Sequence, residues 1–316
     1  IMNNRYGEEY KGDSRFVAKC RKLQSIYREE IGEKIAPYTD RYGNVHYYGN
    51  YISGGEETGA NFLTPYAFQH AKFRVDPANR KPGETIDADR LFNNLLSSQP
   101  MAFNLFCPLM EMREEDPAAA TDVIRTALPD CHIHEVTEVA LEFIPEDYRT
   151  LTGDKSAMDA IIRFKDREGK EGFIAIETKY SENLGTNVAS EKGNAKAIAM
   201  RNIRTLGCFT PEAVALIDSG DIPLTQIYRN FLLSESYAHR YGFDSCSIIL
   251  SPDRHPSTDT EWASLSAYLT DEYKDKLKCM SLEVFVGRIL SCCPLKYRKA
   301  FEDFYDRYLD FDRLHA

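Results

Sequence analysis

Runs of apolar residues, separated by short polar breaks, mark the middle of the chain as a series of strands. Residues 157–164 and 173–180 are apolar or β-branched over most of their length and contain no proline, as expected of strands. The five residues 166–170 between them are polar and include a glycine, which is typical of a hairpin loop. Residues 132–144 alternate enough to form another strand, ended by Pro145. The pattern therefore predicts three consecutive strands.

Apolar positions at helical spacing predict helices on both sides of these strands. Helices are expected over residues 13–34, 85–98, 122–128, 224–241 and 295–309. A short strand is expected over 245–250, a polar loop over 181–202, and either a strand or a helix over 282–290. In order, the centre predicts helix, strand, strand, strand, helix and strand, which is an α/β core with a mixed sheet.

The remaining segments are additions to this core. We expect an N-terminal extension over residues 1–84, the core over 85–294, and a C-terminal helix packed on the core over 295–316. Within the extension, residues 37–59 are rich in tyrosine and glycine. Such a segment suits an irregular hairpin held by its own rings, or an aromatic surface that stacks on bases.

The predicted hairpin brings charged residues together. If it folds symmetrically about Glu168, Asp159 lies opposite Glu177, and Lys179 points to the same face because strand side chains alternate. Carboxylates that face each other between apolar strands need a counter-charge. The arrangement therefore predicts a metal site. The alternative is that Glu177 and Lys179 are exposed neighbours on an edge strand and that Asp159 lies in a turn.

Asp159, followed by Glu177-Thr178-Lys179 inside such a core, resembles the PD-(D/E)xK nuclease superfamily. The segment 97–106 also resembles a poorly characterised branch of restriction endonuclease-like proteins. The resemblance implies a restriction endonuclease-like αβββαβ core with a mixed central sheet flanked by helices, plus N- and C-terminal helical additions. It also implies hydrolysis of nucleic acid, most simply by a DNA endonuclease of restriction or repair type.

The implied chemistry needs a hard divalent ion, Mg²⁺ or Mn²⁺, bound by few carboxylates and several waters. The resemblance assigns the ion to Asp159, Glu177 and the backbone carbonyl of Thr178, and assigns Lys179 to the attacking water and the developing charge. A further acid often completes such sites. Its candidates share one predicted strand, and we choose the one nearest the hairpin: they are Glu135, Glu138 and Glu142, with Glu142 chosen.

Other candidates lie after the hairpin. Some superfamily members carry a helical glutamine near the metal, four residues before a tyrosine; Gln226 fits the first position, but Asn230 occupies the second. Gln226 is therefore a candidate catalytic residue, and Arg229 a candidate substrate contact that could equally pair with a surface acid. Arg201 and Arg204 suit a phosphate-binding flank or a plain solvated helix face.

Charge and cysteine usage limit these readings. The net charge of −10 counts against a broad, non-specific nucleic-acid binder. Eight scattered cysteines without a Cys-x-x-Cys pair favour reduced thiols in the cytoplasm, and no stretch approaches the roughly 18 apolar residues of a membrane span. The expected partner is nucleic acid, with DNA preferred, and cutting both strands of a duplex would favour a homodimer.

Two other classes of function stay open. One is a catalytically silent nuclease-like fold that binds nucleic acid or a protein. The other is an unrelated α/β enzyme that acts on a small metabolite, which the acidic net charge would suit.

Overall fold

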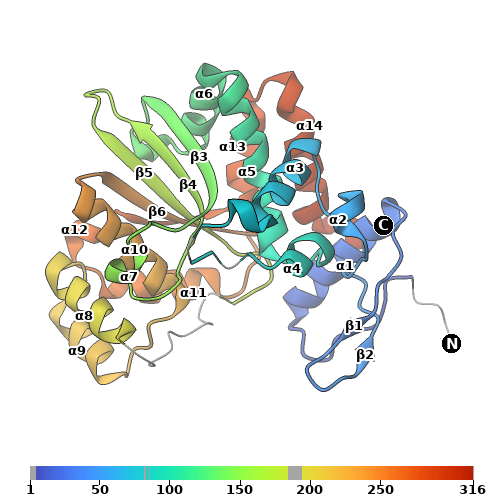
Figure 1. Ribbon diagram of the computed structural model, residues 1–316, viewed down its shortest axis with the longest axis horizontal. Coiled ribbons are helices and arrows are strands. Elements are labelled where there is room, and N and C mark those ends of the chain that lie inside the picture. Colours follow the sequence, from blue (N-terminus) through green and yellow to red (C-terminus); the bar gives the residue numbers. More distant parts are fainter. Residues whose placement is uncertain (1–4, 82, 85, 184–193, 316) are drawn as a thin grey trace.

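A five-stranded mixed sheet forms the centre of the protein (Figure 1). The structure is a computed structural model that describes residues 5–81, 83–84, 86–183 and 194–315. The strands stand in chain order across the sheet: β3 (Glu135–Phe143), β4 (Met158–Lys165), β5 (Glu171–Thr178), β6 (Asp244–Ser251) and β7 (Leu277–Ser281). β3, β4 and β5 are antiparallel, whereas β6 and β7 run parallel to β5. Since β5 is the middle strand, the edge-strand alternative for Glu177 and Lys179 is wrong.

The hairpin between β4 and β5 has the predicted register. Ala160 pairs with Ile176, and the pairing continues without a shift to the turn. In the turn, Asp166 Oδ1 accepts the backbone N–H groups of Glu168 and Lys170, and Gly169 adopts a φ of +81° that favours glycine. Asp159 and Glu177 are the next positions beyond the Ala160–Ile176 pair. Both acids therefore lie at the open end of the hairpin, opposite its turn.

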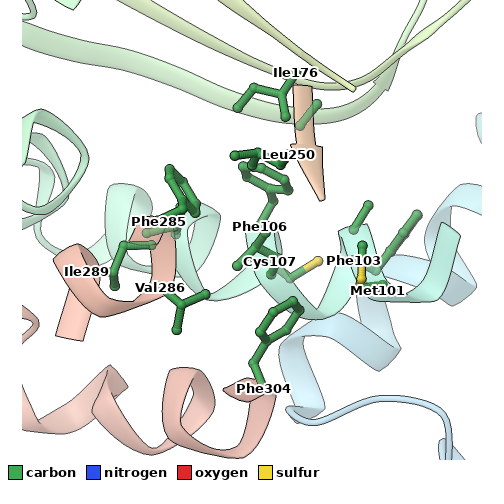
Figure 2. Close-up of a cluster of buried hydrophobic side chains, with 14 of the residues drawn as sticks. Met101, Phe103, Phe106, Cys107, Ile176, Leu250, Phe285, Val286, Ile289 and Phe304 are labelled. Carbon is green, nitrogen blue, oxygen red and sulfur yellow. The ribbon is translucent and has the colours of Figure 1, made fainter. Parts of the chain in front are cut away.

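One face of the sheet is covered by α5 (Ser98–Glu115), with α6 (Pro117–Ala127), α13 (Leu282–Cys292) and α14 (Leu295–Tyr308) packed behind it. Figure 2 shows α5 between the sheet, represented by Ile176 and Leu250, and the side chains of α13 and α14. The helix predicted over 85–98 ends at Asn93 as α4 (Ala88–Asn93), and the helix against the sheet is α5 instead. Because α5 is buried on nearly every side, it lacks the one-sided apolar stripe of a surface helix.

The other face is covered by α10 (Gln226–Tyr241), with α7 (Tyr148–Leu151), α8 (Ala195–Leu206), α9 (Pro211–Ser219) and α11 (Thr258–Tyr268) around it (Figure 1). Part of the loop predicted over 181–202 lies outside the described residues, at 184–193. The rest of that prediction is wrong from Ala195 onward, because Ala199 and Met200 belong to an apolar stripe of α8 that packs in one cluster with α10.

The N-terminal extension packs beside α14 and α5. It contains α1 (Arg15–Glu30), β1 (Tyr38–Thr39), β2 (Val45–His46), α2 (Gly55–Thr58) and α3 (Pro65–Val75). The short helix α12 (Asp271–Lys274) lies elsewhere in the chain, directly before β7. Rings hold the small β1–β2 hairpin: Tyr38 stacks on Tyr51 with centroids 4.7 Å apart, and His46 stacks on Tyr48 at 5.1 Å. This agrees with the irregular hairpin expected for the tyrosine-rich segment.

The expected αβββαβ core is confirmed. Its elements are α5, β3, β4, β5, α10 and β6, and β7 extends the sheet by one more parallel strand. Residues 282–290, left open between strand and helix, belong to α13. In the part of the chain that the structure describes, no helix has both the length and the apolarity to cross a membrane.

Candidate active site

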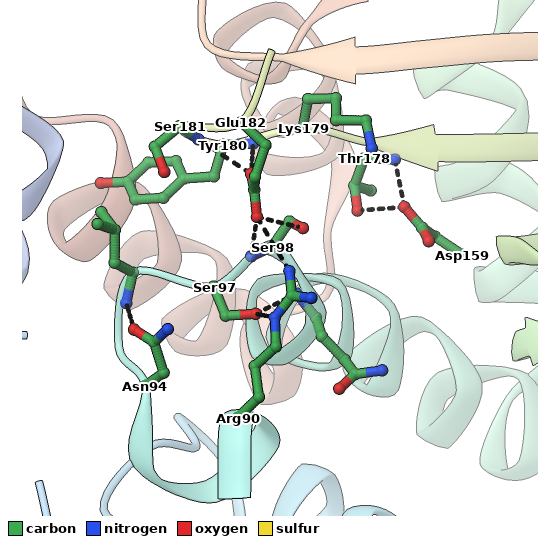
Figure 3. A network of polar contacts seen from close by, with 12 residues as sticks. Arg90, Asn94, Ser97, Ser98, Asp159, Thr178, Lys179, Tyr180, Ser181 and Glu182 are labelled. Carbon is green, nitrogen blue, oxygen red and sulfur yellow. Dashed lines mark hydrogen bonds and ion pairs between the residues drawn. The ribbon is translucent and has the colours of Figure 1, made fainter. Parts of the chain in front are cut away.

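Asp159 and Glu177 lie at the carboxyl end of β5, on the face that α10 covers. Glu177 is only 6% exposed and Thr178 is fully buried. The N–H and Oγ1 of Thr178 donate to Asp159 Oδ2 at 2.7 and 2.9 Å (Figure 3). Glu177 Oε2 accepts from Asn230 Nδ2 of α10. Both carboxylates are therefore held in fixed orientations by groups from neighbouring elements.

Lys179 lies beside these acids although β5 ends one residue earlier. Its N–H donates to the carbonyl of Leu250 on β6 at 2.8 Å, which prolongs the parallel pairing. Its Nζ is 2.6 Å from Glu177 Oε1 and donates to Gln226 Oε1 at 3.0 Å. The side chain is 6% exposed. Acid, lysine and glutamine thus form one buried polar group at the first turn of α10.

Glu142 of β3 is the third acid, in a row with Asp159 of β4 and Glu177 of β5. Leu141 pairs with Ala160 and Phe143 pairs with Met158, so Glu142 lies opposite Asp159. Its φ is +48°, a left-handed conformation that is rare for a non-glycine residue. Gln99 Nε2, at the start of α5, donates to Glu142 Oε1 at 2.9 Å. The strained backbone therefore coincides with a carboxylate that the first core helix holds.

The backbone of Glu142 is held from the N-terminal extension. Arg74 of α3 donates to the carbonyls of Leu141 at 2.6 Å and of Glu142 at 3.3 Å. The same guanidinium forms an ion pair with Glu84 at 2.6 Å, and both side chains are largely buried. Arg74 thus joins the extension to the end of β3.

The protonation behaviour of the acids reflects their crowding. Burial, reinforced by the charge of Asp159, raises the pKa of Glu142 and the pKa of Glu177 to about 7. Burial also raises the pKa of Asp159, although Lys179 and Thr178 oppose the shift. For Lys179, burial disfavours the charge, but Glu177, Asp159 and Glu182 together raise its pKa, so the amine stays charged. A charged lysine thus lies beside crowded acids, two of which have a raised pKa near neutrality.

This donor set fits a hard divalent ion. The acids and the carbonyl of Thr178 are oxygen ligands, and magnesium in proteins uses one or two carboxylates with several waters. Within the described ranges, no three His, Cys, Asp or Glu side chains are placed to hold one metal ion together, so an ion here would be bound by at most two of the acids, with waters as further ligands. Gln99 Oε1 and Asn230 Oδ1 are buried without a hydrogen-bond partner among the described residues, and each belongs to an amide that holds an acid of the site.

A second polar network borders the acids (Figure 3). Glu182 Oε1 accepts the N–H and Oγ of Ser98 at 3.1 and 2.8 Å and pairs with Arg90 of α4 at 3.3 Å. Its other oxygen accepts the N–H groups of Tyr180 and Ser181. Burial alone would raise the pKa of Glu182, but the charge of Lys179 and the backbone N–H groups of Glu182 and Ser98 lower it. Glu182 is therefore a charged anchor for the chain that leaves β5.

The predicted substrate-binding arginines lie around α10 and α8. Arg229 pairs with Asp154 at 2.6 Å and is mostly buried. Arg204 pairs with Asp218 at 2.8 Å and is exposed. Arg201 donates to the carbonyl of Thr150 at 3.4 Å. Of the other candidate acids, Glu138 pairs with Arg163 at 2.9 Å on the solvent side, and Glu135 is exposed at the opposite end of β3.

Three polar residues of this region were not among the predicted site residues. Asn230 was seen only as a departure from the glutamine–tyrosine spacing, although that spacing already put it one helical turn from Gln226. Gln99 lay inside the segment 97–106 that carried part of the family resemblance. Glu182 gave no signal in the sequence, because it reaches Ser98 and Arg90 only through the fold.

A family model described as the PD-(D/E)XK nuclease superfamily matches residues 11–310, nearly the whole chain. No curated protein and no solved structure matches the chain significantly.

Proposed function

Because this chain belongs to the PD-(D/E)XK nuclease superfamily, we propose that it hydrolyses phosphodiester bonds in nucleic acid with the help of a divalent metal ion. The observation that carries this proposal is the row of three acids across β3, β4 and β5, with Lys179 paired to Glu177. Keeping several buried carboxylates ionised side by side is costly unless a cation compensates their charge.

Asp159, Glu177 and the carbonyl of Thr178 are the groups that would hold Mg²⁺ or Mn²⁺. Glu142 would reach the ion through a bound water. When bound, the ion supplies an activated water and polarises the phosphoryl oxygen. Thr178 contributes twice, because its N–H and hydroxyl fix the oxygen Oδ2 of Asp159 and leave the other oxygen available.

Lys179 would stabilise the negative charge that grows on the phosphate and would orient the attacking water. Its charged amine is fixed between Glu177 and Gln226, so little reorganisation is needed when the charge develops. Gln226 thereby acts by positioning Lys179, and Asn230 by positioning Glu177.

We further propose DNA as the substrate, endonucleolytic cleavage of restriction or repair type, and a homodimer for cutting both strands of a duplex. Arg201 and Arg204 are exposed on α8 and can exchange their present partners for phosphates. Arg229 would support the site through Asp154. All eight cysteines are free, which supports a reducing compartment such as the cytoplasm.

The test is cleavage of supercoiled plasmid and of a labelled single-stranded oligonucleotide, with Mn²⁺ or Mg²⁺ and with EDTA. We expect wild-type cleavage only with metal, and a loss of at least ~10²-fold in rate for Asp159→Asn, Glu177→Gln and Lys179→Met. Glu135→Gln, an exposed acid on β3, is the matched control and should cleave as the wild type does. Equal cleavage by the wild type and the site variants would contradict the proposal.

The same assay addresses the catalytically silent alternative. A silent binder would retain oligonucleotides in EDTA and cleave nothing with either metal. The pairing of Lys179 with Glu177 favours catalysis over this alternative, because a binding surface has no need for buried acids beside a buried lysine.

A further inference from the structure

A basic hollow lies at the same edge of the sheet as the acids. Its volume is about 480 Å³, and it is formed by the start of α1, the loop after β6 and the C-terminal segment: Ser14, Arg15, Phe16, Lys19, Arg254 and Phe311, with Pro256 at its side. None of these lining residues is acidic. In a protein with a net charge of −10, three cations around one hollow are a marked local excess of positive charge.

These cations are available to a ligand. Across the described ranges, the side chains of Arg15, Lys19 and Arg254 take part in no hydrogen bond or ion pair, whereas Arg21 on the same helix is paired with Asp13 at 2.6 Å. Arg15 and Arg254 are exposed and Lys19 is half-exposed. The acids near Arg254 include its chain neighbour Asp253 and Glu283. Burial is the main cause that raises the pKa of Glu283, and the charge of Arg254 lowers it.

The hollow is built on a rigid frame. Arg15 and Lys19 are one helical turn apart, so they lie on the same face of α1. Phe16 packs against Phe311 with ring centroids 6.0 Å apart and against His255 at 5.3 Å. These aromatic contacts fix α1 against the loop that carries Arg254, and cations from two distant parts of the chain are thereby held around one space.

The frame continues directly into the candidate active site. His255 is buried, and that burial lowers its pKa and favours the neutral ring. Its Nε2–H donates to the carbonyl of Glu182 at 2.9 Å, and the charge of the Glu182 carboxylate acts on Asp159 and Lys179. Arg254 follows the end of β6 by three residues, and β6 pairs with β5 at the level of Thr178. Hollow and acids thus lie along one edge.

We propose that this hollow is a phosphate-binding site that holds the backbone of a nucleic-acid strand beside the cleaved bond. Two guanidinium groups and one ammonium group that form no ion pair with any described residue suit a phosphate, since arginine offers paired donors and lysine a point charge. A strand whose scissile phosphate lies at Asp159 and Glu177 would pass this edge, and the hollow would hold a neighbouring phosphate of the same strand. The proposal rests on the proposed function, and it gives α1 a role in substrate binding.

Binding without cleavage tests the site. Fluorescein-labelled 30-mer duplex is titrated in EDTA, and anisotropy is followed between 50 and 200 mM NaCl. The variant Arg15→Gln/Lys19→Gln/Arg254→Gln should bind roughly 10-fold or more weakly, and the slope of log affinity against log salt should fall by about 2 to 3, as expected for three lost phosphate contacts. The control Lys34→Gln/Arg167→Gln/Lys170→Gln removes three exposed charges elsewhere and should lose less affinity and less slope.

Equal affinity and slope in the two triple variants would overturn the proposal. A calorimetric titration with inorganic phosphate separates the sources of the ligand: phosphate binding that only the first variant loses, together with unchanged duplex binding, would mean a site for free anions and would also overturn it. Unchanged melting temperatures confirm that both variants fold. Because no metal is present, the result is independent of cleavage: wild-type cleavage with unchanged binding rejects the hollow alone, and lost binding without any cleavage rejects the catalytic proposal alone.

Discussion

At the scale of single residues, the acids Glu142, Asp159 and Glu177 destabilise the fold when they are ionised, because they are buried close together. Lys179 offsets part of the charge of Glu177, but Glu142 and Asp159 still face each other across two strands. Burial and this repulsion raise the pKa of Glu142 and of Glu177 to about 7. Without metal, both carboxyls therefore hold a proton for much of the time near neutral pH, and a divalent ion would displace it.

This predicts a pH dependence for the metal-free protein. In the unfolded chain a glutamate has a pKa of about 4.3, so between that value and about 7 the folded state binds more protons. Stability is then lost as the pH rises through this window. The variant Glu142→Gln/Glu177→Gln has no such carboxyls to ionise, so it does not lose this stability as the pH rises. Its free energy of unfolding in EDTA, minus that of the wild type, should grow by at least ~2 kcal/mol from pH 5 to pH 8, measured by urea unfolding.

The prediction concerns the difference in free energy of unfolding between the double variant and the wild type, because the other buried groups titrate in the same way in both proteins. The single variant Glu135→Gln, which alters an exposed acid, should show a difference from wild type that is flat with pH. A flat difference for the double variant as well would contradict the raised pKa values.

The sequence predicted part of this residue-scale picture. The hairpin symmetry about Glu168 was enough to pair Asp159 with Glu177, because register follows from turn length and strand pattern. The partners from helices were out of reach, since Asn230 and Gln99 meet the acids only after α10 and α5 pack on the sheet. The positive φ of Glu142 was equally unpredictable, because it depends on contacts that hold a conformation the residue disfavours.

At the scale of elements, α3 and β3 act together. The two carbonyls that Arg74 binds belong to the last residues of β3, where Glu142 takes its left-handed conformation. Arg74 also neutralises the buried Glu84. The helix thus stabilises the fold and positions an acid of the site, and these two effects can be separated.

Arg74→Met should cost about 3–5 kcal/mol, because it leaves Glu84 buried without its partner. Adding Glu84→Gln should restore part of the free energy of unfolding, since the uncompensated charge is gone. Cleavage should stay impaired, because nothing then holds the carbonyls beside Glu142. Urea unfolding and the metal-dependent cleavage rate give the two readouts.

Lys72→Met, on the exposed face of the same helix, is the control and should leave both readouts unchanged. Recovery of wild-type cleavage in the Arg74→Met/Glu84→Gln variant would show that Arg74 has a purely structural role.

Prediction of elements succeeded where one face of a segment is apolar. Helices α1 and α14 appear close to their predicted ranges, because each has a solvated side that leaves a periodic pattern. Helix α10 also appears close to its predicted range although it is mostly buried, because polar residues such as Ser234 and Glu235 interrupt its apolar positions. Helix α5 was missed because it is buried between the sheet and α13 and α14. A helix without a polar side carries no period, and its residues suggest only that the segment is buried.

At the scale of the whole molecule, the extension and the C-terminal helix share one hydrophobic core with the central sheet. Leu23, Phe106 and Phe304 come from the three parts of the chain and belong to the same buried cluster. A buried polar contact joins the ends as well: Arg307 of α14 donates to Gln24 Oε1 of α1 and to the carbonyl of Asn61, at 3.0 and 2.9 Å. The extension is thereby fixed against the core.

This joint packing has a consequence for function. Arg15 and Lys19 of α1, Arg74 of α3 and Arg90 of α4 all reach the edge of the sheet that carries the acids or the frame around it. A sheet of this size could hold the acids alone, but the positive groups around them come largely from outside the three strands. The sequence order gave no sign of this, because the contacts join residues far apart in the chain.

The central claim is that Asp159 and Glu177 hold a divalent metal ion. The most direct measurement is a calorimetric titration of Mn²⁺ into the metal-free protein at pH 7.5, with the wild type beside Asp159→Asn/Glu177→Gln. We predict saturable binding to the wild type that is absent from the variant, and stabilisation of the wild type alone, by about 2.7 kcal/mol at 100 times the dissociation constant. Equal binding to both proteins, or no binding to the wild type, would contradict the account.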